Sequence, residues 1–96
     1  MRSFSSACAS GALAIGAALD ALRRGEIEAA VAGGSDSLCL LTYSGFNSLR
    51  AVDAEPCRPF RPDRAGLSLG EGAGALFLET WARAAARGAR PLAVLA

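Results

Sequence analysis

The chain has 96 residues, of which 52% are hydrophobic and 20% charged, and its formal net charge is +1. This composition is apolar for so short a chain, because a small domain has much surface for polar residues to cover. All ten basic residues are arginines without a basic cluster, which argues against nucleic acid as the main ligand. There is no histidine, so the chain holds no Cys/His or Ser/His pair and no imidazole metal site. Such a composition fits a segment from the interior of a larger protein.

Features that would place the chain in a membrane or outside the cell are not seen. The longest apolar run, residues 12–19, is too short to span a bilayer, and residues 1–6 lack the apolar part of a secretory signal. The three cysteines, Cys8, Cys39 and Cys57, are odd in number and form no CxxC pair. These features predict a cytoplasmic protein without a membrane span, a disulfide framework or a zinc site, and we expect no cofactor.

The first half of the chain predicts the end of a strand, then a helix, a second strand and a broken helix. Residues 2–6 read as the end of a strand. Residues 7–24 form a helix that is apolar on every side and is therefore expected to be buried, with Ser5 or Ser6 as its N-terminal cap and Gly25 as its stop. Residues 27–32 predict a strand, and residues 38–52 predict a broken helix.

The second half begins with an irregular loop over residues 53–66, which holds three prolines. Residues 67–78 then predict a strand, 81–87 a helix that ends at Gly88, and 91–95 a last strand. Alternation of strands and helices predicts an α/β layered fold around a buried sheet. The pattern Gly-x-Gly-x-x-Ala over residues 70–75 is typical of dinucleotide sites, but here it leads into a strand and opens no helix, so we reject a nucleotide site.

Cys8 stands where the first strand meets the apolar helix. At such a junction the helix dipole and the free backbone N–H groups favour the thiolate, and the same N–H groups can stabilise an oxyanion when the thiolate attacks an acyl carbonyl. The residues around it, Ala7, Ala9, Ser10 and Gly11, are small enough for a substrate to come close. The alternative is that Cys8 is a small buried hydrophobic residue without chemistry.

The wider pattern favours the first of these two interpretations. The run Ser6-Ala7-Cys8-Ala9-Ser10-Gly11 resembles the active-site motif of the β-ketoacyl-acyl-carrier-protein synthases. The resemblance continues, in the family's order and approximate spacing, through residues 32–36, 45–51, 57–60, 63–66 and 70–75. It is nearer to the type II fatty-acid enzymes than to modular polyketide synthases, whose nucleophile motif more often reads Cys-Ser-Ser.

The resemblance implies a thiolase-like layered αβαβα fold, normally in a homodimer, and a two-step reaction. Cys8 would accept an acyl group from acyl-carrier protein, with its own backbone N–H as one oxyanion-hole donor. Malonyl-acyl-carrier protein would then lose CO2 and attack the thioester, which extends the chain by two carbons. Phe46 matches the aromatic residue that lines the acyl tunnel, with core packing as the alternative. Arg50 matches a position that contacts the acidic carrier protein, with a solvated surface charge as the alternative.

The chain departs from the family pattern at two loop positions. Arg61 stands where relatives have an aspartate after Pro-Phe, and Ala65 replaces the aspartate of an Arg-Asp-Gly run. We expect these two changes to alter the ion pairs that anchor the loop, and not the nucleophile.

The family's two catalytic histidines lie downstream of the matched region. Residues 1–96 are therefore expected to form an incomplete central segment: the rear of the N-terminal half, with the nucleophile, and the beginning of the C-terminal half. Alone, such a segment would make no ketoacyl product. The alternatives are a segment of a polyketide-type ketosynthase and a non-catalytic truncated remnant. A cysteine hydrolase is disfavoured because it too needs a histidine.

Overall fold

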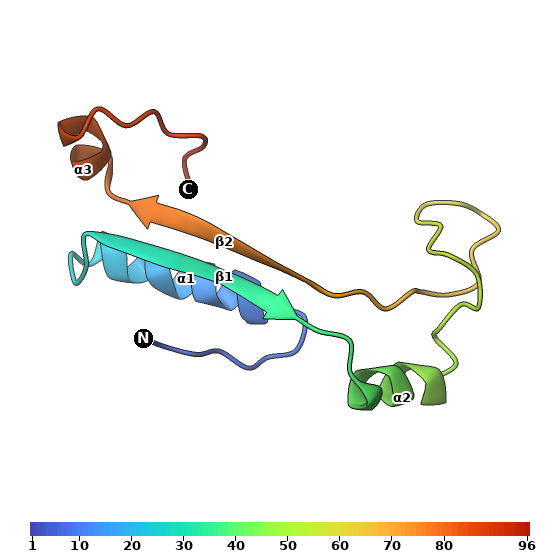
Figure 1. Cartoon of the computed structure of the whole chain (residues 1–96). Coiled ribbons are helices and arrows are strands. Elements are labelled where there is room, and N and C mark those ends of the chain that lie inside the picture. The colour runs from blue at the N-terminus through green and yellow to red at the C-terminus, as the bar shows by residue number, and fades with distance from the viewer. The chain divides into compact units, whose positions relative to one another are not determined.

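The computed structural model describes all 96 residues, in two compact units. The first unit comprises Met1–Ser35 and Ala73–Ala96, and the second comprises Asp36–Gly72. The elements in chain order are α1 (Ser10–Arg23), β1 (Ala29–Asp36), α2 (Leu40–Ser48), β2 (Gly72–Glu79) and α3 (Trp81–Ala86) (Figure 1). The predicted mixture of helices and strands is confirmed, and none of the helices is both long and apolar enough to cross a membrane.

All three helices end in the same hydrogen-bonded motif. The residue after the C-cap has a left-handed backbone, and its amide donates to the carbonyl three residues earlier, while the next amide donates to the carbonyl five residues earlier. Gly25, with φ 70°, and Gly88, with φ 67°, hold this position after α1 and α3, which confirms both predicted stops. After α2 the position is held by Arg50, with φ 54°. Arginine has a Cβ, so α2 ends with a strained residue where glycine is usual.

The starts of the helices differ from one another. Neither Ser5 nor Ser6 caps α1, so that prediction was wrong: the N-cap is Ala9, without a side-chain cap. The reason is that the chain turns tightly before the helix, with the Ala9 amide donating to the Ser6 carbonyl at 3.1 Å. In α2 the Cys39 sulfur accepts a hydrogen bond from the Thr42 amide at 3.4 Å.

β1 and β2 form a two-stranded sheet in which the strands run in opposite directions, with α1 lying along β1 (Figure 1). The backbones in this unit approach closely at glycines. A Cβ on Gly33 would lie 2.0 Å from the Gly74 carbonyl oxygen, and a Cβ on Gly34 would lie 3.1 Å from the Gly11 Cα. The absence of side chains at these positions therefore seats the first turn of α1 on β1 and β1 on β2.

Two predicted strands are not formed. Residues 2–6 and 91–95 belong to no strand of the sheet. A strand needs a neighbouring strand that pairs with its backbone N–H and C=O groups, but neither segment pairs with β1 or β2, and Ser6 forms only an isolated bridge with Cys8.

The sheet and the first helix are only partly buried within these 96 residues. The buried hydrophobic residues are Ala21, Leu22, Ala32 and Ala84. Large apolar side chains on the sheet stay open, with Val31 73% exposed and Phe77 55% exposed. Two strands and one neighbouring helix do not supply enough surface to cover both faces of a sheet.

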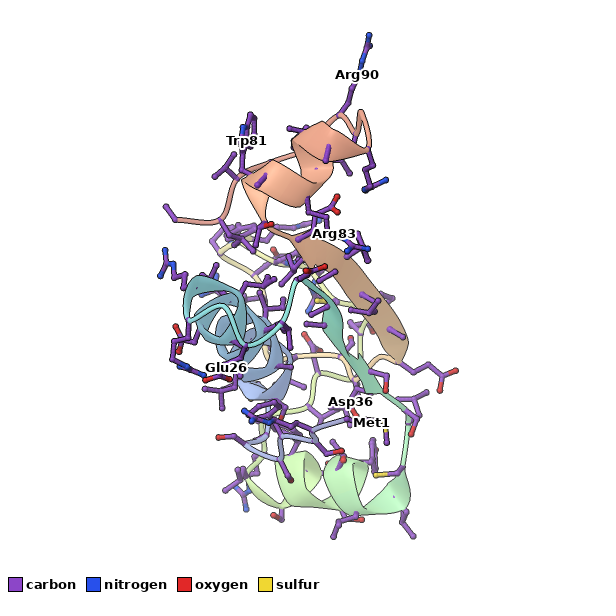
Figure 2. The ribbon with its side chains drawn as sticks, turned by 90° about the vertical axis from the view of Figure 1, so that its left-hand side faces the viewer. Met1, Glu26, Asp36, Trp81, Arg83 and Arg90 are labelled. Atoms are coloured by element: carbon purple, nitrogen blue, oxygen red, sulfur yellow. The ribbon has the colours of Figure 1, made fainter.

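An ion-pair network at the end of β2 holds α3. The Glu79 side chain is only 9% exposed and pairs with both Arg83 and Arg87, and Arg83 also reaches Glu28 at 3.0 Å. Figure 2 shows Arg83 on the side of α3 towards β2, whereas Trp81 points away from the sheet. The hydrogen bonds and charge of Arg87 hold the pKa of Glu79 below its usual value, so Glu79 is ionised at neutral pH.

We expect Gly33→Ala to lower the free energy of unfolding by about 1–3 kcal/mol, because its new methyl group meets fixed backbone of β2 rather than a movable side chain. Gly16→Ala is the matched control: a Cβ there meets nothing within 4 Å, and alanine favours the interior of α1 by about 0.5–1 kcal/mol. Urea unfolding followed by circular dichroism measures both variants. Equal stability of the two would contradict the close approach of the strands.

Candidate functional site

Cys8 lies two residues before α1, in a tight turn. The Ala9 amide donates to the Ser6 carbonyl and the Ser10 amide donates to the Ala7 carbonyl, each at 3.1 Å. Ala7 has φ 47°, a left-handed conformation that is strained for a residue with a Cβ. Cys8 is exposed in this chain. The turn presents the Cys8 thiol to solvent at the beginning of a helix.

The hydroxyl of Ser10 fastens this turn from inside. Its Oγ accepts a hydrogen bond from the Ser6 amide at 2.8 Å and donates one to the Ala7 carbonyl at 2.7 Å. The Cys8 amide makes no hydrogen bond within the chain. Sequence reasoning treated Ser10 only as a small neighbour of the cysteine. The signal that identifies it is a serine at the first turn of a helix, where hydroxyls commonly bind backbone groups.

This arrangement suits attack on an acyl carbonyl. An exposed thiol at Cys8 is a candidate nucleophile, the free Cys8 N–H could donate to an oxyanion, and the first turn of α1 would add a favourable dipole. The chain has no histidine that could act as an acid or a base beside the sulfur. It also has no group of three His, Cys, Asp or Glu side chains placed to hold a metal ion. The site can therefore form a covalent acyl intermediate, and its further chemistry needs other groups.

The predicted site residues fall in different units. Cys8 belongs to the first unit, whereas Phe46 and Arg50 belong to the second. Phe46 is half-buried on α2, which fits both core packing and the lining of a tunnel. Arg50 is exposed and forms no ion pair within the chain. The roles proposed for Phe46 and Arg50 stay predictions.

The backbone of Arg50 is the more informative feature of the second unit. A left-handed non-glycine residue costs about 1–2 kcal/mol, and such strain is found disproportionately at functional sites. Glycine holds the equivalent position after α1 and α3. Helix geometry alone would therefore favour glycine, which has no side chain, at the position of Arg50.

The loop over residues 53–66 is anchored by Asp53, whose side chain is 8% exposed. Its carboxylate accepts hydrogen bonds from the Glu55 amide at 3.0 Å, the Ala65 amide at 3.1 Å and the Arg58 guanidinium at 2.7 Å. These bonds, the backbone amides first, hold the pKa of Asp53 below its usual value of 3.8. Sequence reasoning missed Asp53, although aspartate is a common turn residue because its side chain accepts a hydrogen bond from the backbone amide two residues on.

The two departures from the family pattern leave this anchor intact. Arg61 pairs with its neighbour Asp63 through two contacts of 2.9 Å, and Ala65 contributes its backbone amide rather than a side chain. Asp53 therefore holds the loop together, and the expectation that Arg61 and Ala65 alter the ion pairs found in relatives stays a prediction.

Cys39 and Cys57 differ from Cys8 in their surroundings. Cys39 caps α2, and the hydrogen bonds that its sulfur makes with the Thr42 hydroxyl and amide lower the pKa of its thiol. Cys57 is exposed in the loop and makes no hydrogen bond with its side chain. Cys39 is therefore the cysteine that competes more strongly with Cys8 for a thiol-reactive group. Cys57 serves as the control for the effect of solvent exposure alone.

Comparison with known proteins decides the family. The family model for the β-ketoacyl synthase N-terminal domain matches residues 1–84. The chain belongs to the β-ketoacyl synthase family. Over 92 residues it is 47% identical to nodulation protein E of Rhizobium leguminosarum bv. trifolii, covering 95% of this chain and 23% of that protein. Over 89 residues it is 38% identical to 3-oxoacyl-[acyl-carrier-protein] synthase 2 of Staphylococcus aureus, covering 86% of this chain and 22% of that protein.

Solved ketosynthase structures agree with this assignment. A β-ketoacyl synthase from Burkholderia phymatum STM815 superimposes with a TM-score of 0.84 at 40% identity, covering 90% of this chain and 22% of that one. A type II polyketide ketosynthase in complex with its acyl-carrier protein gives a TM-score of 0.77 at 34% identity, covering 86% and 22%. The structure is thus part of a thiolase-like ketosynthase fold, as the sequence predicted. The chain spans less than a quarter of the length of these relatives.

The lowered pKa of Asp53 predicts a pH-dependent loop. Only the ionised Asp53 carboxylate accepts all three hydrogen bonds. Its contribution to the stability of the loop is therefore complete above about pH 4 and is lost as the pH falls through the lowered folded-state pKa. In NMR spectra recorded from pH 6 to pH 2, the Ala65 amide resonance should shift in the wild type and stay nearly constant in Asp53→Asn. Asp63→Asn, in an exposed pair, is the control and should keep the wild-type titration. A titration unaffected by Asp53→Asn would contradict the anchoring role.

Proposed function

We propose that the protein is a β-ketoacyl-acyl-carrier-protein synthase of fatty-acid biosynthesis in which Cys8 is the acyl-accepting nucleophile. The observation that carries the proposal is the exposed Cys8 thiol in a strained turn at the beginning of α1, inside the region that the family model matches. The identity to a bacterial 3-oxoacyl-[acyl-carrier-protein] synthase supports the fatty-acid role.

In the first step the Cys8 thiolate attacks the carbonyl carbon of an acyl thioester on the carrier protein. A carbon–sulfur bond to Cys8 forms, the bond to the carrier's sulfur breaks, and the carrier leaves as a thiol. The Cys8 N–H stabilises the oxyanion in between. In the second step malonyl-acyl-carrier protein loses CO2, its carbanion attacks the Cys8 thioester, and the Cys8 thiolate is released as the new carbon–carbon bond forms.

The acid–base chemistry of the second step is assigned to residues beyond these 96, because the chain has no histidine. In this proposal residues 1–96 form the rear of the N-terminal half of the enzyme and the beginning of its C-terminal half. Phe46 lines the acyl tunnel and Arg50 contacts the acidic carrier protein. The whole enzyme is a cytoplasmic homodimer. The solved complex of a related ketosynthase with its acyl-carrier protein supports the choice of partner.

A polyketide-type ketosynthase is the second candidate. It is favoured by the likeness to the type II polyketide ketosynthase described above, and the ishigamide ketosynthase/chain length factor is also similar, at 43% identity with a TM-score of 0.81. Both candidates use Cys8 in the same way and differ in the acyl group that it carries. Mass spectrometry of the acyl group trapped on Cys8 in cells distinguishes a saturated fatty chain from a polyketide chain.

The proposal predicts that an acyl thioester acylates Cys8 selectively. Incubation with a fatty acyl-carrier protein should give one adduct, which peptide mass spectrometry places on Cys8 and which Cys8→Ala abolishes. Cys57→Ala and Cys39→Ala are the controls, because Cys57 is also exposed and Cys39 has the lowered thiol pKa. Acylation of Cys39 or Cys57 at the rate of Cys8 would overturn the nucleophile assignment.

The strained position of Arg50 predicts opposite effects on stability and on binding. Arg50→Gly should raise the free energy of unfolding by about 1 kcal/mol, since glycine adopts the left-handed backbone without strain. The same change should weaken the binding of acyl-carrier protein, measured by titration calorimetry, because it removes a positive charge. Arg50→Lys should keep much of the binding without the gain in stability, and Arg90→Ala, at another exposed arginine, should change neither. If Arg50→Gly binds acyl-carrier protein as tightly as the wild type does, Arg50 is a solvated surface charge without a role in carrier binding.

A further inference from the structure

Ser10 occupies an unusual place relative to the nucleophile. It is the first residue of α1, two positions after Cys8, and its hydroxyl is used in both directions, as an acceptor from Ser6 and as a donor to Ala7. The helix does not need this hydroxyl, because the Ser10 amide already donates to the Ala7 carbonyl at 3.1 Å. The side chain therefore makes bonds beyond those that the start of the helix requires.

These bonds act on the peptide group that carries the Cys8 amide. The Ala7 carbonyl and the Cys8 N–H belong to one planar peptide unit, which is trans and in which the two groups point in opposite directions. The carbonyl is held from two sides, by the Ser10 amide at 3.1 Å and by the Ser10 hydroxyl at 2.7 Å. Fixing the carbonyl fixes the direction of the Cys8 N–H on the opposite edge, and that N–H has no other partner in the chain.

The turn also needs such support because Ala7 is left-handed, with φ 47°. An alanine in this region tends to relax towards negative φ unless its surroundings hold it, and relaxation rotates the peptide unit between Ala7 and Cys8. The second bond of the Ser10 hydroxyl, from the Ser6 amide at 2.8 Å, holds the residue on the other side of Ala7. One side chain thus fastens the turn at both ends.

We propose that Ser10 is a positioning residue whose hydroxyl fixes the Ala7–Cys8 peptide so that the Cys8 N–H points at the oxyanion formed during acylation. This rests on the proposed function of Cys8 and assigns a role to a side chain that never touches the acyl group. Loss of the hydroxyl should therefore slow a reaction that passes through an oxyanion and spare one that does not.

Two reactions at Cys8 separate these effects. Acylation by a fatty acyl-carrier protein forms an oxyanion, whereas alkylation by iodoacetamide displaces iodide at a saturated carbon and forms none. Rates at Cys8 are measured by peptide mass spectrometry in the wild type, Ser10→Ala, Ser10→Thr and Ser48→Ala. Ser48 is the matched control, since its hydroxyl also donates to a carbonyl three residues earlier at 2.7 Å, in α2.

Removing an oxyanion donor outright slows acyl transfer about 10²–10³-fold, so misdirecting one should slow acylation of Ser10→Ala about tenfold while alkylation changes less than about twofold. Ser10→Thr keeps the hydroxyl and should restore acylation, and Ser48→Ala should match the wild type. Equal losses of acylation and alkylation in Ser10→Ala would show a general loosening of the turn and would overturn the positioning role.

Hydrogen exchange of the Ser6 amide tests the hydrogen bond independently of any acylation. Ser10→Ala removes the acceptor of this amide and should speed its exchange, whereas Ser10→Thr should not. An unchanged exchange rate in Ser10→Ala overturns the inference, as does normal acylation by Ser10→Ala. If wild-type Cys8 is not acylated at all, the proposed function fails and the role of Ser10 in it fails too.

Discussion

The close contact between the glycine backbones of α1 and β1 is the constraint on which the packing of the first unit depends. Gly11 and Gly34 let the first turn of the helix rest on the end of the strand, and Gly33 lets that strand approach β2. Larger residues would lift the helix from the sheet, and the turn that carries Cys8 would move with it. Small residues around Cys8 thus have two uses if the proposed function holds, because they would admit a substrate and they also set the distance between the helix and the sheet.

Three non-glycine residues have left-handed backbones, namely Ala7, Arg50 and Phe60, and two of them lie where function is proposed. Ala7 precedes Cys8, the proposed nucleophile, and Arg50 follows α2, and glycine would adopt both conformations more easily. Each is held by hydrogen bonds on either side, the first by the Ser10 hydroxyl and the second by the closing bonds of α2. Strained residues persist where the surrounding bonds determine them, and a protein retains them where their geometry or side chain is needed.

Much of this could be predicted from local sequence signals. The stops at Gly25 and Gly88 and the irregular loop follow from glycine and proline, which act over a few residues. The strands expected at residues 2–6 and 91–95 could not be predicted correctly in this way, because strand formation depends on a partner that local sequence does not reveal. The roles of Ser10 and Asp53 were missed for a related reason: each depends on a backbone path that brings several amides to one oxygen.

The cap of α2 has a consequence of its own. Most helices begin with an oxygen acceptor, but here the acceptor is the sulfur of Cys39, and its hydrogen bonds also favour the reactive thiolate. An oxidant or an alkylating reagent that modifies this sulfur therefore removes the first capping bond of α2 as it reacts. Thiol chemistry aimed at the protein thus reaches beyond the nucleophile, because it also frays the helix that carries Phe46 and leads to Arg50.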